Sequence, residues 1–166
     1  TANGIGPIML ALFVALGKKQ GLDPNQYSIV LQNDVLKEYV ARGAYLFPPS
    51  PSLKFSVDAV EFCTRHIPRY KPIVICGSHM RQGGATAVQE IAFTLSNAQA
   101  YIDEAVSRGL NIDDFAPSME CQLSVPMNLF EEVAKYRAFR RMWARMLKDR
   151  YGAQKPESMK CFIRVY

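Results

Sequence analysis

The sequence lacks several patterns that identify common classes of protein. It has no CxxC pair and no Cys/His cluster at metal-ligand spacing, so no metal site is predicted. It has no GxGxxG and no GxxxxGK[ST] segment, which disfavours the nucleotide-binding forms of an open α/β sheet. The longest apolar run, residues 8–16, is about half of the ~20 residues that a membrane span needs. No charged region precedes that run, as it would in a secretion signal.

What is present describes a globular domain. The chain has 166 residues, of which 49% are hydrophobic and 21% are charged, and this supplies enough apolar side chain for a core. The four cysteines are predicted to be reduced, mostly buried thiols of a cytoplasmic protein. The net charge is +5, and cations gather between residues 137 and 150. They are typical of a solvated helix face; a polyanion site is the alternative, but no recognisable nucleic-acid motif accompanies them.

Short apolar runs alternate with segments of helical periodicity. The pattern predicts helices at residues 5–19, 35–41, 52–66, 85–108 and 128–151. Asp34 is the predicted N-cap of the second of these helices. It predicts strands at residues 27–31, 73–76, 119–125 and 161–165. This alternation predicts an α/β fold of parallel βα units, either an open doubly wound sheet or a section of a (β/α)8 barrel.

Three connections have predicted conformations. The proline-rich residues 47–51 are expected to be extended, because each proline restricts the residue before it. The glycine-led residues 77–79 are expected to close the second strand as a loop. Residues 1–4 resemble the turn after a missing strand, and the chain stops inside its last strand. These ends predict a segment of a longer protein.

In a (β/α)8 barrel the working residues lie just past the carboxyl ends of the strands. His79 follows a buried strand and can exchange a proton or hydrogen-bond a carbonyl near neutral pH; a satisfied loop histidine is the alternative. Arg42 can clamp a carboxylate or phosphate, or be an ordinary exposed helix arginine. The same rule marks the polar residues Gln32, Asn33, Ser78, Glu120, Gln122, Arg164 and Tyr166.

Several segments together resemble one protein family. They are QNDVLKEY at residues 32–39 with Arg42, FPPSPS at 47–52, GSHMRQGGA at 77–85, FAP at 115–117, and residues 134–144. They resemble the adenosylcobalamin-dependent acyl-CoA mutases of the methylmalonyl-CoA mutase family, and the likeness covers essentially the whole chain. The resemblance implies a (β/α)8 TIM barrel, of which this chain would be about half, with four βα units. Residues 1–166 would then be a central segment of the acyl-CoA-binding barrel domain of the large subunit.

The resemblance also implies an activity and partners. The activity is a radical carbon-skeleton rearrangement of a short-chain acyl-CoA with adenosylcobalamin, in which the cofactor carries the difficult chemistry. The DxHxxG motif of the cobalamin-binding domain is absent, so another domain or subunit would hold the cofactor. The expected partners are the acyl-CoA, that domain or subunit and the rest of the barrel, in an oligomer without nucleic acid or membrane. The alternative is a non-catalytic acyl-CoA-binding or partner subunit of a mutase complex.

The resemblance assigns roles to individual residues. His79 matches the family histidine that hydrogen-bonds the thioester carbonyl, and Gln32 matches a substrate-contacting glutamine. Arg42 matches the arginine that pairs with a free carboxylate on the acyl group. The remaining matches are Val30 and Leu31, on the acyl-CoA path, and Arg69, which contacts CoA.

This chain also departs from the family pattern at substrate-facing positions. Ser78 stands where the methylmalonyl group has tyrosine, and Ser118, Met119 and Glu120 replace Arg-Leu-Ser. In the last strand, Arg164 and Tyr166 align with a histidine and a glutamine. These changes predict a pocket of different shape, whereas Arg42 favours an acyl group that carries a carboxylate. We therefore expect a malonyl- or succinyl-type CoA bulkier than methylmalonyl-CoA.

Overall fold

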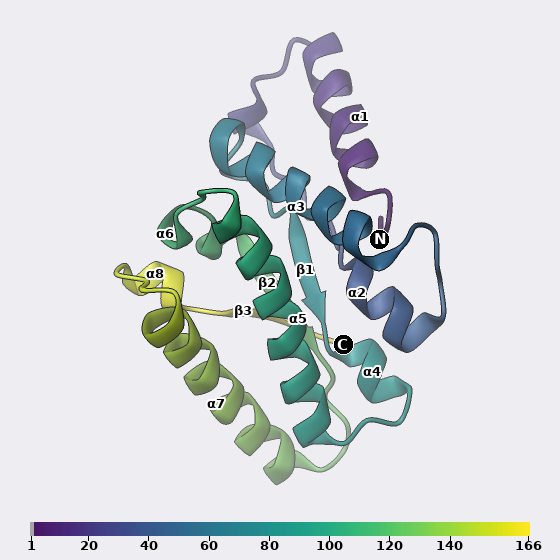
Figure 1. Cartoon of the computed structure of the whole chain (residues 1–166), viewed down its shortest axis with the longest axis vertical. Helices are drawn as coiled ribbons and strands as arrows, with labels where there is room; N and C mark the ends of the chain where they lie inside the picture. Colours follow the sequence, from purple (N-terminus) through teal and green to yellow (C-terminus); the bar gives the residue numbers. More distant parts are fainter. Residues whose placement is uncertain (1) are drawn as a thin grey trace.

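The computed structural model describes residues 2–166 and contains a three-stranded parallel sheet, shown in Figure 1. Its strands are β1 (Ile73–Cys76), β2 (Met119–Leu123) and β3 (Phe162–Val165), in the order β1-β2-β3. The strand predicted at residues 73–76 is confirmed, and all four of its residues are buried. Because the strands are parallel, their carboxyl ends lie at one edge of the sheet.

Side chains of the strands alternate between the two faces of the sheet. Met119 and Cys121 belong to the main hydrophobic core, whereas Glu120 and Gln122 alternate with them and face the other way. On the face that carries Glu120 and Gln122, the pairing register aligns residues in rows across the three strands. One row contains Val74, Glu120 and Phe162, and the next contains Cys76, Gln122 and Arg164.

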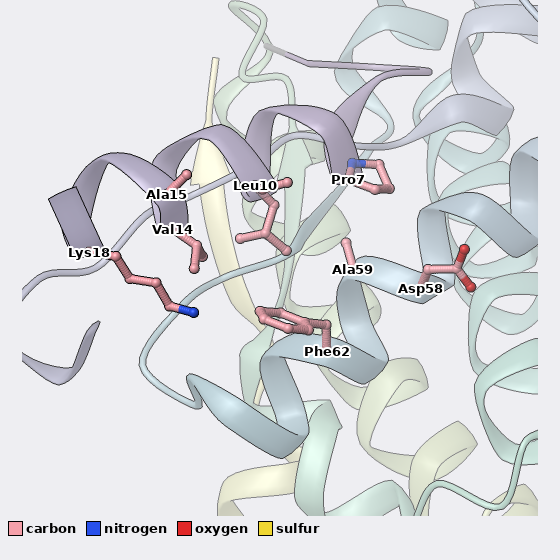
Figure 2. A pocket seen from close by; sticks show the side chains of 9 residues that line it. Pro7, Leu10, Val14, Ala15, Lys18, Asp58, Ala59 and Phe62 are labelled. Carbon is pink, nitrogen blue, oxygen red and sulfur yellow. The ribbon is translucent and has the colours of Figure 1, made fainter. Parts of the chain in front are cut away.

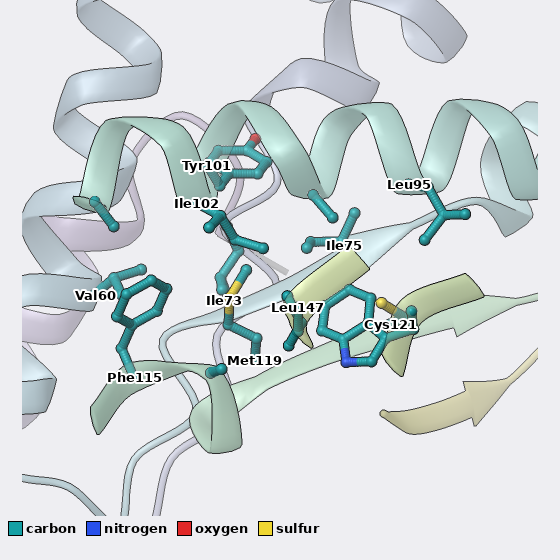
Figure 3. Packing of buried hydrophobic residues seen from close by; sticks show 14 of the residues in the cluster. Val60, Ile73, Ile75, Leu95, Tyr101, Ile102, Phe115, Met119, Cys121 and Leu147 are labelled. Atoms are coloured by element: carbon teal, nitrogen blue, oxygen red, sulfur yellow. The ribbon is translucent and has the colours of Figure 1, made fainter. Parts of the chain in front are cut away.

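Helices cover the apolar face of the sheet. In Figure 3, Ile73, Ile75 and Cys121 point from the strands toward the helix that carries Leu95 and Ile102. The helices and helical turns are α1 (Gly6–Lys19), η1 (Pro24–Gln26), α2 (Val35–Lys37), η2 (Glu38–Arg42), α3 (Pro49–His66), α4 (Ser78–Gln82), α5 (Ala87–Ser107), α6 (Ile112–Phe115), η3 (Ala116–Ser118), α7 (Leu129–Arg145), η4 (Met146–Arg150) and α8 (Pro156–Met159).

The strand predicted at residues 27–31 is present only as an isolated parallel bridge between Val30 and Lys71. Leu31 N–H donates to Lys71 O at 2.8 Å, and Val74 N–H donates to the Gln32 carbonyl at 2.9 Å. Pro72, which has no N–H, lies between these bonds and interrupts a continuous ladder. Residues 29–32 therefore run beside β1 without forming a full strand, so the four predicted strands become three strands and one extended segment.

Other element boundaries also differ from the sequence prediction. The helix expected from residue 52 begins at Pro49, so residues 49–51 are not extended. The first helical turn has no hydrogen-bond acceptors for its N–H groups, and proline is therefore tolerated there. The expected loop at residues 77–79 is wrong from Ser78 onward, where the short helix α4 begins. Asn3 and Gly4 lie in the predicted opening turn, and Thr1 lies outside the described residues.

A buried group of charges joins α5, α7 and the end of β2. Lys135 Nζ lies 2.8 Å from Glu90 Oε2, 2.5 Å from Glu132 Oε2 and 2.6 Å from the Ser124 carbonyl. Glu90 Oε1 accepts the Ser124 N–H at 2.7 Å. The three charged side chains are at most 3% exposed, so each depends on the others for electrostatic compensation.

Replacing Lys135 by Met is expected to lower the free energy of unfolding by about 3–5 kcal/mol, because Glu90 and Glu132 would stay buried without their cation. Urea unfolding followed by circular dichroism measures the change. Arg150→Met is the control, since Arg150 pairs with Asp103 on the surface at 3.1 Å. Its loss should not exceed about 1 kcal/mol. Equal losses in the two variants would contradict the compensating role of Lys135.

Candidate active site

The carboxyl edge of the sheet brings together polar residues from distant parts of the chain. Gln32 ends the extended segment, Ser78 and His79 follow β1, and Gln122 lies near the end of β2. Gly77 makes the close turn after β1 possible, since a Cβ there would overlap the Thr94 hydroxyl of α5. As a result Ser78 is fully buried, and His79 is half-buried at the first turn of α4.

Side-chain hydrogen bonds link these residues in a row. Lys37 Nζ donates to Gln32 Oε1 at 3.0 Å, and Gln32 Nε2 donates to Gln122 Oε1 at 3.4 Å. Gln122 Nε2 donates to Ser78 Oγ at 3.1 Å. Ser78 Oγ lies 3.5 Å from His79 Nδ1. The structure therefore connects four sequence-predicted residues, Gln32, Gln122, Ser78 and His79, in one row.

Asp34 holds the helical segment of the site against the sheet. Its carboxylate accepts the Cys76 N–H at 2.7 Å and the Tyr101 hydroxyl at 2.8 Å. It also caps α2 by accepting the Lys37 N–H at 3.4 Å, as the sequence predicted. Complete burial raises the pKa of Asp34 to about 6. The carboxylate thus joins α2, β1 and α5 directly before the helical segment that carries the charged residues of the site.

Two cations share one carboxylate beside His79. The Lys37 side chain is fully buried, and its Nζ lies 2.5 Å from Glu38 Oε1. Arg42, one helical turn later, reaches the same oxygen at 3.4 Å, and its side chain remains 44% exposed. The group therefore carries a net positive charge, and Arg42 can approach a second anion. Sequence reasoning did not single out Lys37 and Glu38; the available signal was that both lie on the helix that carries Arg42.

His79 lies in an environment that disfavours its charged form. Burial, and then the charges of Lys37 and Arg42, lower the pKa of His79 from 6.5 to about 4. The imidazole is therefore neutral at pH 7 and presents one N–H donor and one acceptor. Such a neutral ring can donate a hydrogen bond to a carbonyl oxygen through its N–H.

The other predicted residues lie on the open face of the sheet, at its amino edge, and in or just after the extended segment beside β1, where Asn33 is fully buried. Glu120 and Arg164 form an ion pair at 2.5 Å on the open face of the sheet, and Tyr166 follows them, 74% exposed. Ser118 and Met119 lie at the amino end of β2, away from His79; the Met119 side chain packs into the core. Arg69 also precedes its strand, and its guanidinium donates to the Asn25 carbonyl. Val30 is exposed and Leu31 is buried.

A separate apolar groove of about 340 Å³ lies between α1 and α3. Figure 2 shows Leu10 and Val14 of α1 facing Phe62 of α3, with Lys18 and Asp58 at the margin. None of the predicted site residues lines this groove. Among residues 2–166, no three His, Cys, Asp or Glu side chains are grouped to hold a metal ion. In the same part of the chain, no helix combines the length and apolar character needed to cross a bilayer.

Comparisons with known proteins match nearly all of this chain. The family model described as methylmalonyl-CoA mutase matches residues 1–165. The chain is 42% identical over 160 residues to the 2-hydroxyisobutanoyl-CoA mutase large subunit of Aquincola tertiaricarbonis, covering 96% of this chain and 28% of that protein. It is 40% identical to methylmalonyl-CoA mutase of Escherichia coli and 37% identical to the mitochondrial methylmalonyl-CoA mutase of Homo sapiens. Each of these two matches covers 159 residues and 96% of this chain. The chain spans 22% and 21% of those two proteins.

Titration of the His79 ring, followed by its C–H resonances in NMR spectra, is expected to have its midpoint near pH 4. Between about pH 6.5 and 4 the unfolded chain binds more protons than the folded chain at this residue, so His79 lowers stability as the pH falls. Arg42→Gln should raise the midpoint because it removes one of the two cations that lower this pKa. Arg65→Gln, which breaks another i,i+4 pair with a glutamate, is the control. An unchanged midpoint in Arg42→Gln would contradict the electrostatic coupling.

Proposed function

The chain belongs to the methylmalonyl-CoA mutase family, and we propose that it forms the acyl-CoA-binding part of a carbon-skeleton mutase. The observation that carries this proposal is the arrangement of a neutral His79 beside Gln32 and the cationic group of Lys37, Glu38 and Arg42. These side chains lie at the carboxyl edge of a parallel sheet, which is where parallel α/β proteins bind their substrates.

We propose that the sheet is part of a (β/α)8 barrel. The parallel order β1-β2-β3, the extended segment before β1, and helices on one face are compatible with such a section. The opposite face carries Glu120, Gln122 and Arg164, and it would line the interior of the closed barrel. Closure also removes unpaired strand edges, which favour association with other chains.

In the proposed mechanism His79 binds the thioester carbonyl of the acyl-CoA. Its depressed pKa keeps the ring neutral, so the N–H acts as a hydrogen-bond donor across the physiological pH range. The bond would strengthen as negative charge develops on the carbonyl oxygen during the rearrangement. Gln32 and Ser78, which are hydrogen-bonded to the same row, would restrict the orientation of the ring and of the substrate.

Arg42 is proposed to pair with a carboxylate on the acyl group. The excess positive charge of Lys37, Glu38 and Arg42 favours an anion at this position, and the guanidinium is partly exposed. We therefore propose a malonyl- or succinyl-type acyl-CoA. The Glu120–Arg164 pair, Ser78 and Tyr166 would shape the pocket differently from that of methylmalonyl-CoA mutases.

The CoA part of the substrate is proposed to run toward the opposite edge of the sheet. Arg69, Ser118 and Met119 lie at the amino ends of the strands, and Val30 and Leu31 belong to the neighbouring segment. A cation such as Arg69 suits the phosphates of CoA. The candidate residues thus divide into an acyl end around His79 and a CoA end around Arg69.

Adenosylcobalamin, when bound, would supply the radical chemistry of the rearrangement. The two histidines of this chain do not suit the lower cobalt ligand: His79 is engaged with Ser78, and His66 is exposed at the end of α3. We therefore propose that another domain or subunit holds the cofactor. The barrel would orient the acyl group and exclude water. The four free thiols support a reducing, cytoplasmic compartment, and an oligomer is expected from the family.

The full-length protein, supplied with adenosylcobalamin and any separate cobalamin subunit, is expected to isomerise one dicarboxylic acyl-CoA. Chromatography with mass spectrometry would test a panel of branched and linear acyl-CoAs, with and without a second carboxylate. His79→Ala should lower kcat by about 10²-fold or more, because an oriented donor to the developing charge is lost. Acyl-CoA and cofactor binding without isomerisation of any substrate would instead support a non-catalytic subunit.

Arg42→Gln is expected to shift kcat/KM away from carboxylated acyl-CoAs and toward acyl groups without a carboxylate. The physical reason is the loss of a charge-assisted, bidentate contact. The measurement compares kcat/KM for a matched pair of substrates that differ in that carboxylate. Arg65→Gln on α3 is the control, and it should leave the ratio unchanged. An unaltered ratio in Arg42→Gln would exclude the clamp.

A further inference from the structure

Two groups that can only donate determine which way the Gln32 amide faces. Lys37 Nζ, which is ion-paired with Glu38, lies 3.0 Å from Gln32 Oε1. The Asp34 backbone N–H donates to Asn3 Oδ1 at 3.1 Å, which turns the Asn3 amide nitrogen toward the same Gln32 oxygen at 2.8 Å. An ammonium and a backbone N–H can only donate, so Asn3 must accept with its oxygen from Asp34, and the oxygen of Gln32 must face both Lys37 Nζ and Asn3 Nδ2. The Gln32 Nε2 must then point toward Gln122.

The orientation of the Gln32 amide determines which atoms donate and accept in the following hydrogen bonds of the row. Gln32 Nε2 approaches Gln122 at 3.4 Å, so the Gln122 oxygen faces Gln32 and its Nε2 faces Ser78 at 3.1 Å. Ser78 Oγ accepts this bond, and its own hydrogen needs an acceptor because the side chain is fully buried. The acceptor beside it, within the described residues, is His79 Nδ1 at 3.5 Å. A nitrogen that accepts carries no proton in the neutral ring.

We propose that Gln122 and Ser78 are positioning residues. Because Lys37 can only donate, it fixes which group donates in each hydrogen bond of the row, through Gln122 and Ser78 to His79. The neutral His79 ring is thereby held with its proton on Nε2. The Nε2–H is then the group free to bind substrate. Its catalytic consequence rests on the proposed role of His79, but the position of the proton does not. A side chain without these capacities would break the row: residue 78 must accept and donate at one atom, and residue 122 must accept on one side and donate on the other.

We call this row of hydrogen bonds from Lys37 to His79 the relay. It predicts that Gln122→Glu reverses the direction of the last hydrogen bond, the one between Ser78 and His79. A carboxylate only accepts, so it would accept the Ser78 hydrogen, and Ser78 Oγ would then accept a hydrogen from His79 Nδ1. The proton of the ring would move from Nε2 to Nδ1. Gln122→Met and Ser78→Ala, which remove the relay without adding charge, should give a mixture of the two tautomers.

The test uses the full-length protein labelled with ¹⁵N-histidine, with His79 identified by the signals lost in His79→Gln. Correlations between ring nitrogens and carbon-bound hydrogens distinguish the tautomers, and a pH of about 8 keeps the ring neutral even beside an added carboxylate. We expect Nε2–H in the unaltered protein and Nδ1–H in Gln122→Glu. Gln26→Glu, an exposed site outside the row, is the control and should retain Nε2–H. Circular dichroism confirms that each variant is folded.

Nδ1–H in the unaltered protein, or Nε2–H retained in both Gln122→Glu and Ser78→Ala, would overturn the relay. In parallel, kcat of Gln122→Glu should fall about 10²-fold with a smaller change in KM, because a ring protonated on Nδ1 has no donor left on Nε2 for the substrate. A protein with Nε2–H that isomerises no acyl-CoA would overturn the proposed function and leave the relay intact. An unaltered protein that isomerises an acyl-CoA but carries the His79 proton on Nδ1 would overturn the relay and leave the proposed function intact.

Discussion

The carboxylate of Asp34 is the contact on which the rest of the site depends. It is fully buried and accepts hydrogen bonds from Cys76 N–H at the end of β1, from Tyr101 of α5 and from the first turn of α2. Since a buried carboxylate is costly without such partners, all of these elements must be in place together. Asp34 therefore couples the formation of the sheet edge to the position of the helix that carries Lys37, Glu38 and Arg42.

The fold separates apolar packing from polar chemistry by strand alternation. One face of the sheet packs against α5 and α7 and is reinforced by the buried group of Glu90, Glu132 and Lys135. The other face and the carboxyl edge carry amides, a hydroxyl, an imidazole and an ion pair. Because the side chains beneath form a buried core, the polar side chains can be held in a hydrogen-bonded row.

The electrostatics of this edge are consistent with its proposed use. Burial and then the positive charge of Lys37 and Arg42 lower the pKa of His79, and under the proposed function the same charge would attract an anionic acyl group. A neutral imidazole beside cations is a donor whose strength comes from orientation more than from charge, and orientation is what a hydrogen-bonded row supplies. Membership of the methylmalonyl-CoA mutase family is established on residues 1–165, and the substrate and cofactor of the full protein follow as proposals.

By itself, the sequence determined the α/β class, β1 at residues 73–76, the cap formed by Asp34 and the family, because these depend on local patterns and motifs. It also marked Gln32, Ser78, His79 and Gln122 through the rule that working residues follow parallel strands. Only the tertiary structure decided that Pro72 interrupts the pairing of residues 29–32 and that Lys37 and Glu38 join the site. It also decided that the amides form one directed row, since contacts between residues 90 positions apart follow from packing and not from local pattern.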